Sequence, residues 1–130
     1  MDEIDTKILK LLKRNSRMSF IELGREVGLS EGAVRRRVKK LVEDGTIQRF
    51  TIEIKGEREA IVLIKTDPAK TSYVTERVRE IAGKAFEVSG DFDVAAYITA
   101  LSIEEVNRMV DRIRNLPYVL ETNTLIKMFE

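Results

Sequence analysis

The first third of the chain has the hydrophobic period of amphipathic helices. Apolar residues follow an i, i+4, i+7, i+8 pattern from Ile4 to about Arg14, which predicts a helix with one buried face. Ser19 and Glu22 then have the spacing of a capping box, in which each side chain accepts a hydrogen bond from the other residue's backbone amide. The helix that this box opens is expected to end at Gly28 and to bury Ile21, Leu23 and Val27.

A third helix is predicted to begin almost immediately after the second one ends. Ser30 is its expected N-cap, the helix runs to about Asp44, and Gly45 ends it. Two helices joined by a short Gly-Leu-Ser turn have the spacing of a helix-turn-helix. The inward side of the third helix is expected to carry Val34, Val38, Leu41 and Val42.

The pattern changes to period two after Gly45. Polar and apolar residues alternate over 47–54, which predicts a β-strand or an extended wing. The next segment, 55–59, is short, charged and contains a glycine, as linkers often are. The sequence therefore predicts a winged helix-turn-helix domain over 1–54, a linker over 55–59, and a second domain over 60–130.

The second domain is predicted to alternate strands and helices. Strands are expected over 60–65, 86–89, 94–99 and 118–126, and the first helix over about 71–82. Ser102 and Glu105 have the spacing of a second capping box, which opens the other helix with Val106, Met109, Val110 and Ile113 inward. This βαββαβ order is the ferredoxin-like plan, so the predicted fold class is α+β.

Composition narrows the possible functions. The 130 residues include neither cysteine nor histidine, which removes thiol nucleophiles, zinc–thiolate sites, and the commonest general base and metal ligand. We therefore expect no enzyme, no cofactor and no metal site. No apolar run approaches the roughly 18 residues of a membrane span, and the N-terminus is acidic and amphipathic, so a cytoplasmic protein without a membrane partner is expected.

Charge is distributed unevenly between the two halves. The whole chain carries a net charge of +1, but residues 1–55 carry +4 and residues 56–130 carry −3. The third helix alone carries five cations against Glu31 and Glu43. A basic helix-turn-helix joined to an acidic half suggests two parts with different partners, the first of them double-stranded DNA.

The outward side of the third helix is centred on Arg36. Small residues at 32 and 33 would let the helix enter the major groove, where Arg36 is the best candidate for reading a base edge. The other cations are expected to neutralise phosphates, and the helix start at Ser19 could add a backbone amide. The simpler alternative is a solvated helix face. The predicted DNA-binding residues are Ser19, Ser30, Gly32, Ala33, Arg35, Arg36, Arg37, Lys39 and Lys40.

These segments resemble a known family, the leucine-responsive/AsnC regulators. The resemblance rests on Asp2–Asp5, the run Glu22–Ser30, the run Val34–Val38, the turn Ser89–Val94, and the C-terminal residues Leu116–Val119 with Thr122–Thr124. It implies a winged helix-turn-helix and a dimerising, effector-binding ferredoxin-like domain of the RAM type. It also implies that dimers assemble further, often into octamers, and bind amino acids between dimers near the glycine–aspartate turn. The linker is shorter here than in many relatives.

A candidate effector site follows from the turn and from that resemblance. Gly90 permits a tight turn whose amides could face a carboxylate, while Asp91 or Asp93 could accept an amine. Thr122 and Thr124 share one strand face, and Asp111 lies on the outward side of its helix. In the family, matching positions contribute to amino-acid recognition, and an acid at 111 would suit a basic side chain. Ordinary turn and strand chemistry is the competing explanation.

The predicted function is therefore a sequence-specific DNA-binding regulator that responds to an amino acid or related metabolite. Three alternatives are an architectural DNA-binding protein of low specificity without an effector, an enzyme on a ferredoxin-like scaffold, and a ligand sensor that does not bind DNA. The missing His and Cys speak against the enzyme, and the charge split speaks against the DNA-independent sensor. The DNA-binding half does not distinguish the regulator from the architectural protein.

Overall fold

The computed structural model describes residues 1–128, and the last two residues of the predicted second domain lie outside the described residues. The chain divides into two compact units, Met1–Glu53 and Ile54–Glu130. Each unit has its own hydrophobic core, and the two cores share no residue. No helix in the described part of the chain is long and apolar enough to cross a membrane.

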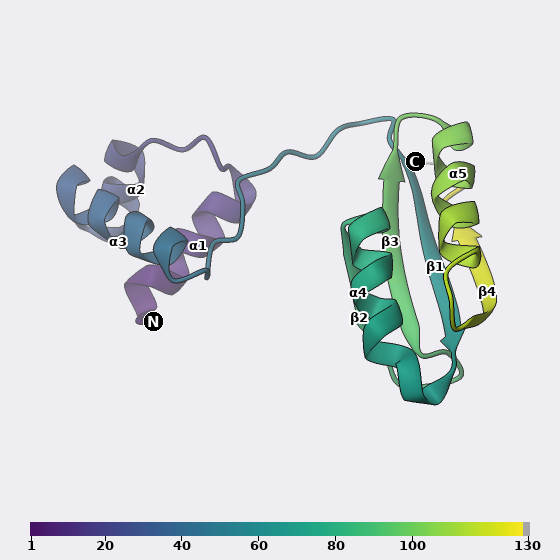
Figure 1. Ribbon diagram of the computed structural model, residues 1–130. Coiled ribbons are helices and arrows are strands. Elements are labelled where there is room, and N and C mark those ends of the chain that lie inside the picture. Colours follow the sequence, from purple (N-terminus) through teal and green to yellow (C-terminus); the bar gives the residue numbers. More distant parts are fainter. Residues whose placement is uncertain (129–130) are drawn as a thin grey trace. The chain divides into compact units, whose positions relative to one another are not determined.

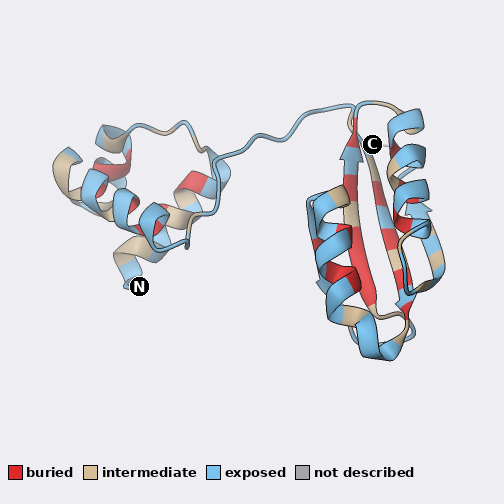
Figure 2. Ribbon diagram, viewed as in Figure 1, coloured by how far each residue is buried: buried red, intermediate tan, exposed pale blue. Residues whose placement is uncertain are grey.

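The N-terminal unit consists of three helices around a small apolar core. Helix α1 spans Glu3–Arg14, α2 spans Phe20–Val27 and α3 spans Glu31–Glu43 (Figure 1). The buried positions lie on the sides of the helices that face one another (Figure 2). They are Ile8, Leu12, Leu23, Val34 and Val38. The predicted helix-turn-helix is confirmed.

Local capping signals set the helix boundaries as the sequence predicts. The Ser19 hydroxyl accepts from the Glu22 amide at 3.1 Å, and the Glu22 carboxylate accepts from the Ser19 amide at 3.2 Å, so the capping box is complete. Ser30 caps α3 by accepting from the Ala33 amide at 3.2 Å. Gly28 ends α2 with a φ of 74°, a left-handed conformation that favours glycine.

The turn between α2 and α3 requires a close approach at Gly24. The carbonyl of Gly24 accepts hydrogen bonds from the amides of Gly28 and Leu29, at 2.8 and 3.0 Å. A Cβ atom added to Gly24 would overlap the backbone oxygen of Leu29. The turn can therefore fold back over α2 only because this buried position carries no side chain.

Two residues predicted to be buried in these helices are exposed instead. Ile21 is 53% exposed because the buried stripe of α2 runs through Phe20, Leu23, Gly24 and Val27, one position away from it. Val42 is 45% exposed because it lies at the edge of the stripe formed by Val34, Val38 and Leu41. A bundle of only three helices leaves such edge positions uncovered.

The strand predicted over 47–54 is not present. The segment is anchored at its start, where the Ile47 amide donates to the Leu41 carbonyl at 2.9 Å, and the Ser16 hydroxyl donates to the Thr51 carbonyl at 3.3 Å. Phe50, Ile52 and Ile54 alternate along it as the sequence suggested, but all three are exposed. Period-two alternation does not make a strand in this chain because no neighbouring strand pairs with the segment.

The C-terminal unit is a four-stranded antiparallel sheet with two helices on one face (Figure 1). The strand order is β2-β3-β1-β4, and the chain order is βαββαβ, so the predicted ferredoxin-like plan and the α+β class are confirmed. Its elements are β1 (Arg58–Thr66), a 3₁₀ turn (Pro68–Lys70), α4 (Thr71–Ala82), β2 (Lys84–Glu87), β3 (Val94–Ala100), α5 (Ile103–Arg114) and β4 (Val119–Ile126).

Three local differences from the sequence prediction have identifiable causes. Strand β2 lies two residues earlier than predicted, because residues 88–93 form a connection with its own backbone hydrogen bonds. The capping box at Ser102 is only half formed within residues 1–128, since its hydroxyl accepts from the Glu105 amide without a return bond. Met109 is half-buried at the edge of the core, whereas its three predicted companions are buried.

The two faces of the sheet differ in cover. Ala60, Val62 and Ile64 of β1 point toward α4 and α5 and are fully buried. The alternate residues of β1 point to the open face, where Ile61 and Leu63 lie between the charged Glu59 and Lys65. Across the strands this open face carries Ile61, Leu63, Phe86, Ala95, Tyr97 and Leu125.

Candidate nucleic-acid interface and effector region

Arg36 and Lys40 form the centre of the outward face of α3. Both side chains are exposed, and neither forms a salt bridge within residues 1–128. The Arg36 guanidinium lies back along the helix toward Gly32, where a Cβ atom would be 3.6 Å from its Nη1. Both cations border an open hollow of about 690 Å³, together with Ala33.

Arg35 and Lys39 lie on the same helix but have acidic partners within it. Arg35 pairs with Glu31 one turn earlier, and its guanidinium lies over the Phe20 ring at 4.9 Å from the centroid. Lys39 lies 3.9 Å from Glu43 one turn later. Both side chains are exposed, so these pairs compete with solvent and contribute little to stability.

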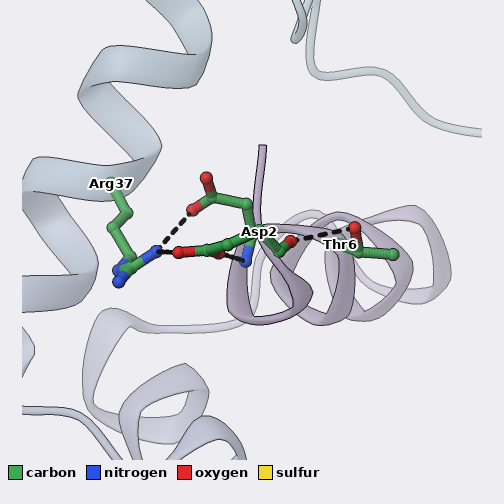
Figure 3. A network of polar contacts seen from close by, with 4 residues as sticks. Asp2, Thr6 and Arg37 are labelled. Carbon is green, nitrogen blue, oxygen red and sulfur yellow. Dashed lines mark hydrogen bonds and ion pairs between the residues drawn. The ribbon is translucent and has the colours of Figure 1, made fainter.

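Arg37 differs from the other four cations of α3. Its Nη1 atom lies 2.7 Å from an oxygen of Asp2 and 3.0 Å from an oxygen of Asp5, both at the start of α1 (Figure 3). The side chain is 31% exposed. Its hydrogen bond lowers the pKa of Asp2, and the two carboxylates raise the pKa of Arg37. The structure thus places this predicted DNA-binding residue in a contact between α1 and α3.

The pairing changes the electrostatics expected from sequence. Counted alone, α3 has five cations and two carboxylates. Asp2 and Asp5 bring two more carboxylates to the same surface, which leaves a net charge of +1. The positive field is therefore concentrated on Arg36 and Lys40 rather than spread evenly along the helix.

The remaining predicted DNA-binding residues form or lie within the first turns of α2 and α3. The hydroxyls of Ser19 and Ser30 accept from helix amides, and the Ser19 amide already donates to Glu22. Gly32 and Ala33 are half-buried on the first turn of α3. Because these two residues are small, no large side chain projects from them beside Arg36.

In the C-terminal unit, the connection between β2 and β3 presents an exposed turn. Gly90 has a φ of 118°, which a residue with a side chain rarely adopts. The Asp91 side chain is exposed, while its carbonyl accepts from the Lys65 ammonium at 2.8 Å. The same ammonium lies 5.9 Å from the centre of the Phe92 ring. Lys65 thus holds the turn from the neighbouring strand.

Asp93 is committed to holding the fold. Its Oδ2 atom accepts from the backbone amide of Thr66 at 2.9 Å, and its own amide donates to the Ile64 carbonyl at 2.9 Å. The buried Thr66 hydroxyl lies 2.7 Å from that of Thr71, at the first residue of α4. This network joins the turn to the end of β1 and the start of α4.

The other predicted effector residues come from different parts of the unit. Thr122 and Thr124 are half-buried on the helix-covered side of β4, where they oppose Ile64 and Val62. Ile64 also receives the Asp93 amide, so Thr122 and the turn flank the same end of β1. Asp111 is exposed on α5 and pairs with Arg114 at 3.3 Å. No hydrogen bond within residues 1–128 joins Asp111 to the turn or to the threonines.

Sequence reasoning missed a polar cluster on the opposite end of the open sheet face. The Glu59 carboxylate accepts from the Tyr97 hydroxyl and, at 2.7 Å, from the Lys127 ammonium. These donors lower the pKa of Glu59, and the contact with Glu59 raises the pKa of Tyr97. The three residues border a cavity of about 320 Å³, with Ile61 and Leu125 in its wall. Only the strand pairing brings these distant positions together.

Comparison with known families matches both units. The profile of the AsnC-type helix-turn-helix domain matches residues 1–42, and that of the Lrp/AsnC ligand binding domain matches residues 59–130. A full-length relative is the HTH-type transcriptional regulator LysM of Sulfurisphaera tokodaii. It is 39% identical over 131 residues, covering 97% of this chain and 94% of the relative.

Solved structures agree with the fold. LrpC of B. subtilis has a TM-score of 0.71 at 27% identity, covering 100% of this chain and 96% of that protein. A transcriptional regulator from Neisseria meningitidis, solved as a complex with L-Met, has a TM-score of 0.75 at 21% identity, covering 100% and 91%. At that lower identity the likeness shows the fold alone.

Proposed function

Because this chain belongs to the Lrp/AsnC family of HTH-type transcriptional regulators, we propose that it binds duplex DNA with the outward face of α3 and that an amino acid controls this binding. The observation that carries the DNA-binding part is the pair Arg36 and Lys40. They are exposed cations on the second helix of the helix-turn-helix, with no salt bridge within residues 1–128 to compete for them.

The two cations have different proposed roles. Arg36 lies over the first turn of α3, the part of a recognition helix that reaches base edges, and its planar fork can donate two hydrogen bonds to guanine. Lys40 lies one turn later and neutralises a phosphate, as do Arg35 and Lys39 when DNA displaces their weak pairs. The helix starts at Ser19 and Ser30 position the two helices for this contact.

Substitutions of Arg36 and Lys40 distinguish these roles. Arg36→Ala is expected to weaken binding to a selected duplex by about 1–3 kcal/mol and to relax sequence preference at one position. Lys40→Ala is expected to weaken all duplexes alike and to make the salt dependence shallower by about one unit. Affinities measured by fluorescence anisotropy over a salt series provide the test. If both variants bind as the parent does, α3 is not the DNA-binding surface.

The same assay decides between a regulator and a low-specificity architectural protein. A regulator bound to a duplex selected from a random pool keeps that duplex in the presence of excess random-sequence competitor. An architectural protein exchanges between the two in proportion to their concentrations. We expect the first result, because Arg36 offers a base-reading group in addition to phosphate contacts.

The proposed assembly is a symmetric dimer formed through the open sheet faces. The centre of that face is apolar and has no cover from the unit's own helices, and Ile61, Leu125 and Phe86 are exposed on it. Two such faces packed together would join two DNA-binding units, which could then contact successive major grooves about 34 Å apart on a palindromic site. Further assembly into octamers belongs to the same proposal.

The proposed effector is an amino acid bound near the turn at Gly90. The ligand-binding domain matched at 59–130 and the L-Met complex of the Neisseria protein support this class of ligand. The backbone amides of this exposed turn and the Asp91 carboxylate suit an α-carboxylate and an α-amine, with Thr122, Thr124 and Asp111 as further expected contacts. Asp93 holds the turn for them. A thermal-shift screen of the amino acids tests this, and no shift with any of them would contradict it.

A further inference from the structure

The contact between Arg37 and the start of α1 lies beside the proposed DNA-binding surface. Asp2, Asp5 and Arg37 border the same hollow as Arg36, Ala33 and Lys40. A phosphate approaching Arg36 and Lys40 would therefore meet two carboxylates and a third cation that these carboxylates already hold. The arrangement places two carboxylates beside the proposed DNA-binding cations.

The two carboxylate oxygens of Asp2 have separate roles. Oδ1 accepts from the Asp5 amide at 2.8 Å and so caps α1, whereas Oδ2 accepts from Arg37 at 2.7 Å. The Asp2 carbonyl also accepts from the Thr6 hydroxyl at 3.0 Å (Figure 3). Because asparagine caps helices about as well as aspartate, the charge of Asp2 is not needed to begin the helix.

Stability alone does not account for the pair either. The Asp2 side chain is 54% exposed and that of Arg37 is 31% exposed. Ion pairs with this much solvent contact stabilise folded proteins only slightly, whereas the Arg37–Asp5 pair is better shielded, with the Asp5 side chain 18% exposed. We therefore look for the main effect of the Asp2 charge in the binding of a phosphate from outside.

We propose that Asp2 and Asp5 determine the specificity of DNA binding by withholding Arg37 from the phosphate backbone. Phosphate contacts strengthen binding to every sequence, so removing one cation from them lowers non-specific affinity without affecting base reading by Arg36. Specificity is the difference between the two affinities, and repulsive groups raise it as effectively as attractive ones. This inference rests on the proposed DNA-binding surface of α3.

The test is the double substitution Asp2→Asn, Asp5→Asn in the full chain, assayed with a random-sequence duplex and with a duplex selected by the parent protein. Freed from its partners, Arg37 adds one phosphate contact. The affinity loss between 50 and 200 mM salt is then expected to grow by about 3.5-fold on random DNA. Random-sequence affinity rises at low salt, and the ratio of selected to random affinity falls.

Arg37→Gln separates this mechanism from a simple loss of negative charge. Alone, it is expected to leave the salt dependence unchanged, because Arg37 makes no phosphate contact in the parent. In the Arg37→Gln background, the double substitution is expected to add no salt dependence. Asp67→Asn is the matched control, since Asp67 is also a capping aspartate but lies in the C-terminal unit. Thermal melting followed by circular dichroism shows whether each variant is folded.

Several results would overturn the inference. A shallower salt dependence for Arg37→Gln would mean that Arg37 already contacts phosphate. An equal gain in affinity with and without Arg37 would reduce the effect to general repulsion. If Asp2→Asn, Asp5→Asn has no effect while Arg36→Ala and Lys40→Ala weaken binding, only this inference is wrong. If the parent ignores duplexes at low salt, the proposed function is wrong as well.

Discussion

Replacing a glycine by alanine is expected to have opposite effects on stability at two positions of the N-terminal unit. At Gly24 the new methyl group would meet the Leu29 carbonyl oxygen, which is backbone, whereas at Gly32 it would meet only the end of the flexible Arg36 side chain at 3.6 Å. We expect Gly24→Ala to lower the free energy of unfolding by about 1–3 kcal/mol through overpacking. Gly32→Ala should raise it by about 0.5–1 kcal/mol through helix propensity.

Chemical denaturation of the two variants beside the parent measures this difference. The Gly32→Ala variant also serves the DNA-binding proposal, because a more stable chain with weaker affinity for DNA would place position 32 at the groove. Equal stability of Gly24→Ala and the parent would show that the turn after α2 can move without cost, contrary to the packing described above.

Sequence alone predicts the residues whose partners are close in the chain. Ser19 with Glu22, and Ser30 with the first turn of α3, are correct because a cap and its partner are three positions apart. Arg37 is different. Its partners at positions 2 and 5 lie in another helix, so sequence reasoning placed it with the DNA-contacting cations.

At the level of elements, helices depend on partners that are close in the chain, whereas strands depend on partners that are distant in it. The helix α4 has the predicted boundaries because the period of its apolar residues and the glycine that ends it, Gly83, are local signals. The alternating segment 47–54 forms no strand, whereas β1, whose centre is the continuous apolar run 60–64, does. A strand exists only with a neighbour, and period-two alternation carries no information about whether a neighbour is available.

The contact of Glu59 with Tyr97 and Lys127, which joins β1 to β3 and to the residue after β4, predicts a pH dependence of stability. Glu59 has a lowered pKa because Lys127 and Tyr97 donate to it. Its contribution to the free energy of unfolding is therefore present above the ordinary glutamate pKa and is lost as the pH falls through the lowered value. Tyr97 has a raised pKa because its hydroxyl donates to Glu59. Its contribution is present below the ordinary tyrosine pKa, about 10, and is lost as the pH rises through the raised value.

The free energy of unfolding of Tyr97→Phe, measured against pH, tests the alkaline side of this expectation. The deficit of this variant relative to the parent should stay constant through neutral pH and shrink once the parent's hydroxyl ionises. Tyr73→Phe is the control, because the Tyr73 hydroxyl forms no hydrogen bond within residues 1–128. A deficit that vanishes already near neutral pH would contradict the assigned contact.

At the level of the whole molecule, the open sheet face predicts an association that one charge should prevent. Ile61→Lys puts an ammonium in the middle of this face without disturbing the core beneath α4 and α5. We expect the mass from light scattering to fall to that of one chain, 14.9 kDa. DNA affinity should fall with it, because two joined units bind more tightly than one.

The matched control is Leu101→Lys, which changes an exposed leucine between β3 and α5 in the same way but lies outside the sheet. It should keep the parent's mass and affinity. A parent that is already a single chain at micromolar concentration would refute the proposed dimer, and with it the expected spacing of the two DNA-binding units.

The close approach at Gly24 also bears on how this protein can change over time. The atom that blocks a larger residue there is a carbonyl oxygen of the main chain, which every amino acid possesses. No second mutation that merely trims a neighbouring side chain can therefore make room, so suppressors of Gly24→Ala in a genetic screen should be revertants at that codon or substitutions that stabilise the fold elsewhere, such as Gly32→Ala. At most core positions a larger side chain can be compensated by a smaller one next to it, but at Gly24 no side-chain substitution can compensate in this way.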